Sequence, residues 1–248
     1  MTPGRQLFLI FGASRGLGRA IYNQASRFTA NDFILVSRHP AKISRPNSKT
    51  IVLDLAQMVR AEILTQLFDW PLAAEYEAIF LINNASVVEP IKPVGQIESS
   101  RLVDAFWINF LNYSLIMNEF IKQTKDMPAV KKRILNISSG AAVTPHHGLA
   151  VYSSAKAALE MLTECIFLEQ QTLKQVKILA LRPGVMDTAM QKIIRETAAE
   201  DFPTGTIHRE LGRQKKLLPP EQVAEKIYKI LETEIYWQKP IIDIAEVK

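Results

Sequence analysis

Short apolar segments alternate with longer amphipathic segments along the chain, and this alternation constrains the fold more than any other feature. Apolar runs of this length are typical of strands buried on both faces of a parallel sheet. Strands that alternate with helices connect by right-handed crossovers. We therefore predict an α/β fold, a Rossmann-like doubly wound parallel sheet of about seven strands with helices on both faces. The predicted strands are Leu7–Phe11, Phe33–Ser37, Thr50–Leu53, Ala78–Ile82, Ile134–Ile137, Val176–Leu181 and Ile241–Ile244.

The amphipathic segments have the residue spacing of helices. Weaker helical patterns cover Asp187–Ala199 and Ile207–Lys215, so the pattern alone determines Thr188–Pro219 poorly. No internal repeat or flexible linker interrupts the series, and residues 1–248 are predicted to form a single domain. The stronger predicted helices run from the glycine-rich turn to about Arg27, from the third strand to about Leu67, and over Ser99–Thr124, Val151–Leu173 and Glu221–Thr233.

Composition and charge narrow the class of protein. The single cysteine, Cys165, has helical spacing to Leu162 and Ile166 and is expected to be buried. The net charge is +5, but the basic residues are scattered, so no nucleic-acid surface is expected. No segment approaches the roughly 18 apolar residues that a membrane span needs, and no signal peptide is recognised. We expect a cytoplasmic protein without a metal site.

The first predicted strand runs into Gly12-Ala13-Ser14-Arg15-Gly16-Leu17-Gly18, which a helix follows. The first glycine of this turn permits a tight bend. The later two let the backbone approach a pyrophosphate and let the helix pack closely on the sheet. The helix N-terminus supplies free N–H groups to phosphate oxygens. Between a strand and a helix, this turn predicts a dinucleotide-binding site.

The end of the second predicted strand indicates which nicotinamide nucleotide binds. An NAD site usually places an Asp or Glu there, which bonds the ribose 2′-hydroxyl. This strand ends in Ser37-Arg38-His39 without an acid, and Arg38 suits the 2′-phosphate of NADP. Arg15, inside the glycine turn, faces the same region. We therefore predict NADP(H) as the cofactor, and solvated surface cations are the alternative interpretation of both arginines.

Polar residues also follow the third and fourth predicted strands. Asp54 can accept a hydrogen bond from the adenine amino group. Asn83-Asn84-Ala85 ends the fourth strand, and ligands bind at the carboxyl ends of strands in open α/β sheets. Asparagines also cap and turn chains, so this motif is a weak indication by itself.

The strongest catalytic pattern joins Ser139, after the fifth strand, to Tyr152 and Lys156 at the start of a helix. Tyr152 and Lys156 are four residues apart and share one helix face. A lysine beside a phenol stabilises the phenolate and lowers its pKa from about 10, which suits Tyr152 to protonate an alkoxide. Ser139 can hold the carbonyl oxygen. These residues predict the reduction of a small-molecule carbonyl substrate.

With these motifs, nearly the whole chain resembles the short-chain dehydrogenase/reductase family. One departure is Ser86, where the family usually has glycine. The resemblance implies a homodimer or homotetramer and a tetrad of Asn109, Ser139, Tyr152 and Lys156. In that tetrad Lys156 also bonds the nicotinamide ribose, and Asn109 helps to hold a water that connects to Lys156. The implied cofactor contacts are Gly12, Ser14, Arg15, Gly16, Leu17, Gly18, Ser37, Arg38, Asp54, Leu55, Asn84, Ala85, Tyr152, Lys156, Pro183, Gly184, Val185 and Thr188.

Two features narrow the resemblance within the family. The segment Pro183–Gln191 and the placement of Asp243 look like those of sepiapterin reductases, in which a C-terminal Asp anchors pterin N–H groups. Diketone reductases similar to benzil reductase share the pattern, and Asp243 can simply end a strand. The predicted substrate contacts are thus Ser139, Tyr152 and Asp243, with His146-His147 at the pocket rim as a further candidate. The alternatives are another ketone or alcohol oxidoreductase of the family, and a non-catalytic NADP-binding regulatory protein.

Overall fold

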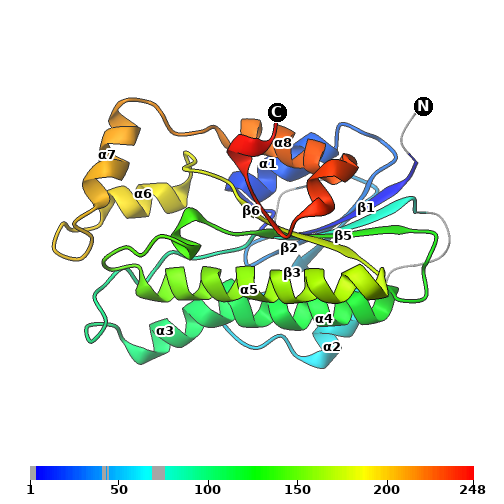
Figure 1. Cartoon of the computed structure of the whole chain (residues 1–248), viewed down its shortest axis with the longest axis horizontal. Coiled ribbons are helices and arrows are strands. Elements are labelled where there is room, and N and C mark those ends of the chain that lie inside the picture. Colours follow the sequence, from blue (N-terminus) through cyan, green and yellow to red (C-terminus); the bar gives the residue numbers. More distant parts are fainter. Residues whose placement is uncertain (1–3, 41–42, 44, 69–75) are drawn as a thin grey trace.

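The computed structural model describes residues 4–40, 43, 45–68 and 76–248. Within them, seven strands form one parallel sheet in the order β3-β2-β1-β4-β5-β6-β7 (Figure 1). The strand order reverses between β1 and β4, which creates a crevice at the carboxyl ends of these two strands. The predicted doubly wound α/β fold is confirmed. The strands are β1 (Gln6–Phe11), β2 (Asp32–Ser37), β3 (Ser48–Val52), β4 (Ala78–Asn83), β5 (Lys131–Ile137), β6 (Lys177–Arg182) and β7 (Ile241–Asp243).

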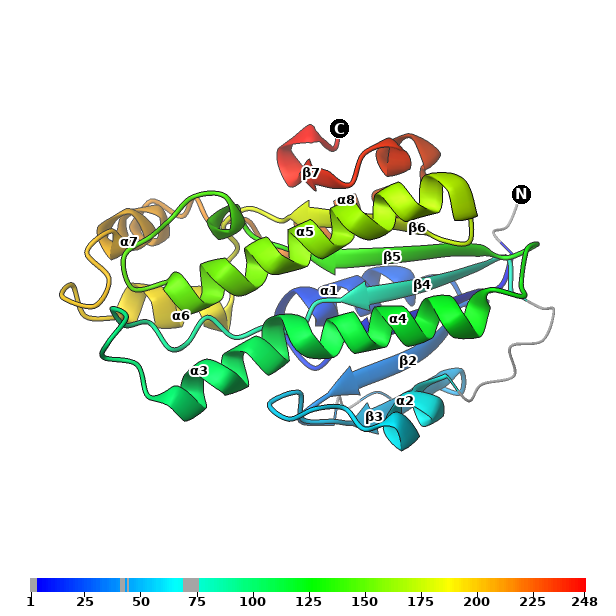
Figure 2. The ribbon, with the colours of Figure 1, turned by 60° about the horizontal axis from the view of Figure 1, so that its bottom comes forward.

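Helices cover both faces of this sheet (Figures 1 and 2). One face carries α1 (Gly16–Ala25) and α8 (Pro220–Glu232), and the other carries α2 (Ala61–Leu67), α4 (Asn112–Thr124) and α5 (Ala150–Leu173). Along β1, Phe8 and Ile10 pack into the core beneath α1 and α8, whereas Leu7, Leu9 and Phe11 pack into the core beneath α4 and α5. Burial on both faces is the reason that successive residues of these strands are apolar.

The predicted helix Ser99–Thr124 is continuous but changes its winding in the middle. It consists of α3 (Ser99–Phe106), a π-helical turn η1 (Trp107–Leu111) and α4. Such π-helical turns occur frequently at functional sites. Asn109 lies within η1 and is fully buried, so the irregular turn carries one of the predicted tetrad residues.

Helix α2 begins later than predicted, at Ala61. The reason is the buried side chain of Asn112 on α4. Its Nδ2 donates to the carbonyl oxygens of Leu55 (2.9 Å) and Gln57 (2.8 Å), and its Oδ1 accepts from the N–H of Val59 (2.8 Å). Since these backbone groups bond to Asn112, they are withdrawn from helical hydrogen bonding, and the segment after β3 stays irregular.

An excursion between β6 and α8 contains α6 (Ala189–Glu196) and α7 (Gly205–Arg213). It extends beyond the carboxyl ends of the strands (Figure 2). The two ends of the excursion meet, because the N–H of Asp187 donates to the carbonyl oxygen of Leu218 (2.9 Å) and the N–H of Leu218 donates to that of Val185 (2.9 Å). The weak helical patterns in this region are therefore real helices, and backbone hydrogen bonds join the two ends of the excursion.

Cys165 is exposed, so the prediction that it is buried is wrong. It lies on the outer face of α5 with Met161 and Leu168, whose side chains are 60% and 68% exposed. Ile166, by contrast, packs into the core. Helical spacing relates residues to one another, but it does not show which face of a helix another element covers.

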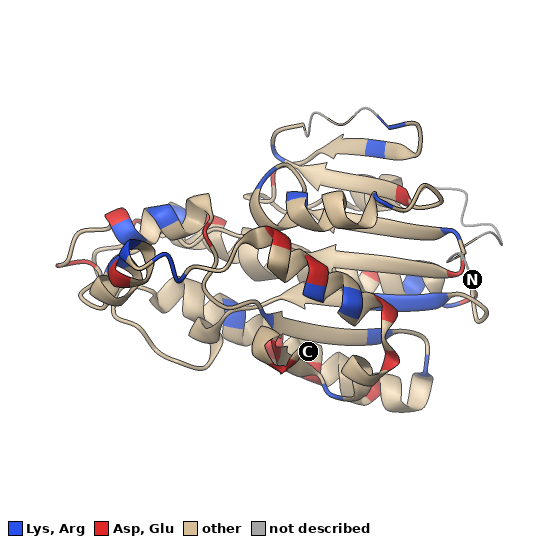
Figure 3. Ribbon diagram, turned by 90° about the horizontal axis from the view of Figure 1, so that it is seen from above, with Lys and Arg blue, Asp and Glu red and all other residues tan. Residues whose placement is uncertain are grey.

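Charged residues are distributed over the molecule. In Figure 3, Lys and Arg are interspersed with Asp and Glu along the helices and at the strand ends. Many of them pair, as do Arg5 with Asp32 (2.7 Å) and Lys131 with Glu77 (3.0 Å). In the described part of the chain, no helix is long and apolar enough to cross a membrane, and no three His, Cys, Asp or Glu residues gather as a metal site would require.

Candidate active site

The glycine turn joins β1 to α1 and leaves little room for side chains. Gly12 and Gly16 have φ angles of 80° and 54°, in the left-handed region that favours glycine. A Cβ atom on Gly18 would lie 2.2 Å from the carbonyl oxygen of Gly12. The turn therefore presents its own backbone and the first N–H groups of α1 to the crevice, which is the geometry of an anion-binding helix N-terminus.

Asn84 fastens the glycine turn to β4. Its Nδ2 donates to the carbonyl oxygens of Phe11 (3.2 Å) and Gly12 (3.3 Å). A Cβ atom on Gly12 would come within 2.8 Å of the backbone of Ala85, whose carbonyl oxygen in turn accepts from the Tyr113 hydroxyl (2.5 Å). The Asn-Asn-Ala motif thus holds the glycine turn in place at the crevice between β1 and β4.

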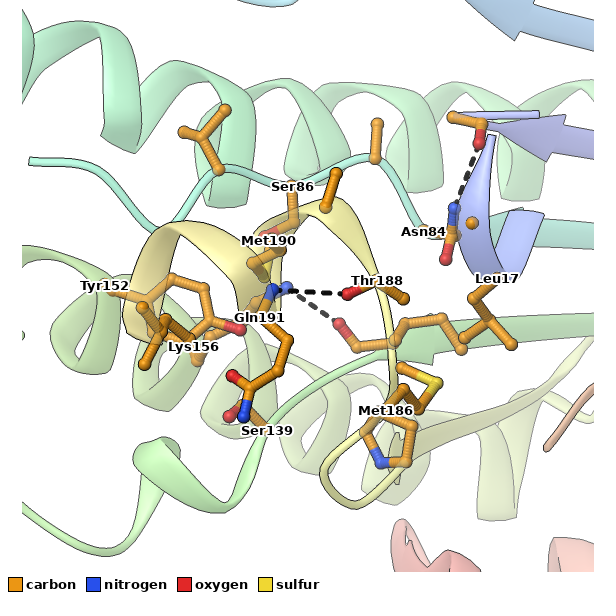
Figure 4. Close-up of a pocket in the computed structure, with 18 of the residues that line it drawn as sticks. Leu17, Asn84, Ser86, Ser139, Tyr152, Lys156, Met186, Thr188, Met190 and Gln191 are labelled. Atoms are coloured by element: carbon orange, nitrogen blue, oxygen red, sulfur yellow. Dashed lines mark hydrogen bonds between the residues drawn. The ribbon is translucent and has the colours of Figure 1, made fainter. Parts of the chain in front are cut away.

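The structure brings Ser139, Tyr152 and Lys156 together from the end of β5 and the start of α5. Figure 4 shows them on one side of a cavity, with Leu17 and Asn84 on the other. The Tyr152 hydroxyl forms hydrogen bonds with the side chains of Ser139 and Ser86. Lys156 Nζ donates to the carbonyl oxygen of Ile137 (2.8 Å) and lies 5.7 Å from the centre of the Tyr152 ring. The hydroxyl groups of Ser139 and Tyr152 and the amine of Lys156 therefore lie in the same part of the cavity.

Burial controls the protonation of this group. Desolvation raises the pKa of Tyr152, and its hydrogen bonds to Ser139 and Ser86 partly oppose the increase. Desolvation also lowers the pKa of Lys156 to about 7, against the opposing charge of Glu160. The prediction that Lys156 lowers the pKa of Tyr152 is therefore wrong for the protein by itself, since burial favours the neutral form of both groups. A neutral phenol is the form that can donate a proton.

Asn109 contacts the site through Ser86. Asn109 Oδ1 accepts from the Ser86 hydroxyl (2.7 Å) and from the N–H of Val87 (3.0 Å), and Asn109 Nδ2 donates to the carbonyl oxygen of Val87 (2.9 Å). Ser86, which the sequence presented only as a departure from the family pattern, thus links Asn109 to the hydroxyl of Tyr152. The water link from Asn109 to Lys156 stays a prediction.

A buried ion pair lies beside Lys156. Glu160, one turn further along α5, is only 4% exposed. Its carboxylate accepts two hydrogen bonds from Arg182, at 2.9 and 2.7 Å, and one from the Ser138 hydroxyl at 2.6 Å. Sequence reasoning missed this cluster, because Ser138, Glu160 and Arg182 are far apart in the chain and belong to no motif.

One cavity of about 1220 Å³ joins the glycine turn to the catalytic residues. Its volume exceeds the roughly 300–1,000 Å³ of a pocket for one drug-sized ligand, so a cofactor and a substrate can fit together. The predicted site residues line this cavity, apart from Gly18 and Asn109. The lining members are Gly12, Ser14, Arg15, Gly16, Leu17, Ser37, Arg38, Asp54, Leu55, Asn84, Ala85, Ser139, Tyr152, Lys156, Pro183, Gly184, Val185, Thr188 and Asp243.

The end of the cavity beside β2 carries two cationic side chains. Arg15 and Arg38 line it and are exposed there. The Ser37 hydroxyl donates to the carbonyl oxygen of His39 (2.6 Å), which holds the chain next to Arg38. Asp54 lies nearby, although its Oδ1 already accepts from the N–H of Ala56 (3.0 Å). Arg15 and Arg38 provide positive charge here, and the carboxyl end of β2 carries no acid.

Asp243 also lines the cavity, at its border with the last strand. Its carboxylate lies 3.6 Å from Arg182 and belongs to a capping box with Glu246. The side chain is 53% exposed, so it remains accessible while serving these structural contacts. Of the two adjacent histidines, His146 lines the cavity and His147 is exposed. Substrate contacts by Asp243 and His146 stay predictions.

A family model described as "short chain dehydrogenase" matches residues 6–199. The chain belongs to this family. The match runs from β1 through α6 and includes the glycine turn and the Ser139–Tyr152–Lys156 group. This membership makes the protein an oxidoreductase, and it confirms the family resemblance predicted from the sequence.

Two kinds of characterised relative are similar over almost their full length. A benzil reductase ((S)-benzoin forming) from Bacillus cereus is 38% identical over 247 residues, which cover 96% of this chain and 98% of the relative. A sepiapterin reductase from Meriones unguiculatus is 25% identical over 259 aligned positions, which cover 98% and 97%. Both subfamilies named by the sequence pattern are therefore among the relatives, and the benzil reductase is the more similar of these two.

Solved structures share the fold. The KRED1-Pglu enzyme superposes with a TM-score of 0.80 at 23% identity, covering 96% of this chain and 100% of its own. A short-chain dehydrogenase from Shigella flexneri, solved in complex with NADP, superposes with a TM-score of 0.74 at 18% identity and covers 98% of both chains. At these identities the likeness concerns the fold alone.

Proposed function

We propose that residues 1–248 form one dinucleotide-binding domain that reduces a ketone or an α-dicarbonyl compound with NADPH. The observation that carries this proposal is the single cavity, with the glycine turn and two arginines at one end and Ser139, Tyr152 and Lys156 at the other. The cofactor supplies the hydride when it is bound. The similarity to benzil reductase over both whole chains supports a carbonyl substrate.

Side chains of this protein supply the proton that the reduced carbonyl oxygen takes up, and they stabilise the negative charge that develops on that oxygen. Ser139 and Tyr152 direct their hydroxyl groups to the carbonyl oxygen, which gains negative charge as the carbonyl carbon is reduced. Tyr152 then donates its proton to that oxygen, because its raised pKa keeps the proton on the phenol until the reaction occurs. Lys156, whose lowered pKa of about 7 leaves part of it protonated at neutral pH, stabilises the phenolate that remains. Burial excludes water from this proton transfer.

The cofactor assignment is tested by Arg38→Ala. We expect KM for NADPH to rise about tenfold to 100-fold, since a hydrogen bond to a charged group contributes about 1.5–3 kcal/mol. KM for NADH should change little, because NADH has no 2′-phosphate. Arg60→Ala, at an exposed position outside the cavity, is the matched control. An equal loss for NADH and NADPH would remove the assignment of Arg38 to the 2′-phosphate.

The choice between diketone and pterin substrates is tested by NADPH consumption with benzil and with sepiapterin in parallel. The greater similarity to benzil reductase favours benzil. Preferential turnover of sepiapterin that is lost in Asp243→Ala would instead indicate a pterin reductase. Turnover of neither compound would contradict the proposed function.

The outer face of α5 supports the predicted homodimer or homotetramer. Met161, Cys165 and Leu168 lie one helical turn apart and are exposed, which suits burial against a second copy of the chain. Light scattering at micromolar concentration should give at least the mass of a dimer. Leu168→Glu should lower that mass, whereas Met58→Glu, at a similarly exposed apolar position away from α5, should not. A monomeric wild-type protein would rule out this assembly.

A further inference from the structure

A polar pair, one buried residue and one half-buried residue, connects the two helices of the excursion above the cavity. Gln191 on α6 is 3% exposed, and its Nε2 lies 3.0 Å from Nδ1 of His208 on α7. Both residues line the cavity that contains Tyr152. Figure 4 shows Gln191 extending from α6 on the same side as Ser139 and Tyr152. This pair is a polar feature of the substrate end that the catalytic group does not use.

The hydrogen bond determines which atoms of the pair can still donate. With the amide nitrogen of Gln191 as the donor, Nδ1 of His208 accepts, and this assigns the ring proton to Nε2. Burial lowers the pKa of His208, and the nearby His146 lowers it further, which keeps the ring neutral. The Nε2–H of His208 and the second N–H of Gln191 have no other hydrogen-bond partner among the described residues. Beside the Gln191 carbonyl oxygen, the pair therefore offers two neutral N–H donors, and these match a neutral acceptor.

Packing holds the pair in place. The ring of His208 lies 5.7 Å from that of Phe202, which is fully buried and also contacts His146 at 6.4 Å. The surrounding wall is apolar, with Met190, Ile194 and Ile207 among its members. Donors set in an apolar wall bind an oxygen acceptor strongly, because leaving either partner unpaired in a buried site is costly.

We propose that Gln191 and His208 form a second oxygen site, which binds the unreacting oxygen of an α-dicarbonyl substrate while Ser139 and Tyr152 bind the reacting one. This inference rests on the proposed carbonyl reduction and specifies its substrate class. A compound with two adjacent carbonyl groups presents two acceptor oxygens, one for each pair of donors. The apolar wall then accommodates its hydrocarbon substituents, and binding both oxygens decides which carbonyl faces Tyr152.

The test compares benzil with deoxybenzoin, which has the same two phenyl rings but lacks one carbonyl oxygen. In His208→Phe and in Gln191→Leu, the ratio of kcat/KM for benzil to kcat/KM for deoxybenzoin should fall about tenfold, the effect of one lost hydrogen bond to a buried site. The different intrinsic reactivities of the two ketones cancel, because each variant is compared with wild type on the same pair. Gln214→Leu, an exposed position at the end of α7, should keep the wild-type ratio.

Further measurements separate recognition of the second carbonyl oxygen from effects on folding. His208→Gln keeps an N–H donor and should retain part of the preference for benzil. Titration of each variant with NADPH by fluorescence reports whether the fold and the cofactor end are intact. A parallel fall for benzil and deoxybenzoin with intact NADPH binding would overturn the second oxygen site while leaving carbonyl reduction in place. Reduction of neither compound by the wild-type protein would reject the proposed function and this inference with it.

Discussion

Replacement of Tyr152 by phenylalanine is expected to reduce kcat for carbonyl reduction by about 10²- to 10⁴-fold, the usual contribution of a positioned general acid. The change removes one oxygen atom from a residue whose ring is already buried and packed. Its hydroxyl is the neutral proton donor of the site, and Lys156 Nζ lies 5.7 Å from the centre of its ring. Steady-state consumption of NADPH with benzil measures the effect.

Two controls distinguish the loss of proton transfer in Tyr152→Phe from a loss of cofactor binding or of the fold. NADPH binding by Tyr152→Phe, followed by fluorescence, should stay within a few-fold of wild type, since the aromatic ring remains. Tyr236→Phe, which packs at the edge of the core beneath α1 and α8, should retain full activity. Activity near wild type in Tyr152→Phe would refute the assignment of the proton donor and would favour the non-catalytic, regulatory alternative.

Replacement of Glu160 by alanine is expected to lower the free energy of unfolding by about 3–5 kcal/mol, as the loss of one partner of a buried ion pair usually does. Arg182 would keep its charge, with its guanidinium 18% exposed and its two hydrogen bonds to the carboxylate gone. For a chain of this length the melting temperature should fall by roughly 6–20 °C. Thermal unfolding followed by circular dichroism measures the change.

The exposed pair of Lys192 and Glu196 on α6 provides the comparison for Glu160. Its atoms lie 3.8 Å apart, and both side chains are mostly exposed. Glu196→Ala should therefore cost less than about 1 kcal/mol. A loss as small in Glu160→Ala would show that the buried pair contributes no more than a surface pair. The loss of unfolding free energy in Glu160→Gln should lie between those of Glu160→Ala and Glu196→Ala. Glutamine keeps the side-chain shape and an acceptor oxygen but not the charge.

The sheet and the main catalytic residues were predictable because their signals are local. Strands such as β1 and β4 are buried on both faces and are mostly apolar, which marks them in the sequence. The glycine turn is equally local, since the positive φ angles of Gly12 and Gly16 and the close contact of Gly18 exclude most other residues. Tyr152 and Lys156 meet because a helix brings residues four apart to one face.

The features that sequence reasoning missed depend on contacts between distant segments. The late start of α2 is caused by Asn112, which lies on another helix. The exposure of Cys165 depends on what covers α5. The direction of the Tyr152 pKa change is decided by burial, which spacing along a helix does not reveal. Gln191 and His208 pair only because α6 folds against α7.

The joined ends of the excursion separate its two helices, which line the cavity, from the residues that carry the proton. The chain leaves the sheet after Val185 and returns at Leu218, and backbone hydrogen bonds hold these two points together. The closure of this segment tolerates changes in its length, because closing a loop twice as long costs only about 0.6 kcal/mol more. Ser139, Tyr152 and Lys156 lie outside residues 186–217, so substitutions that alter the substrate wall in this segment leave the residues of the proton transfer in place.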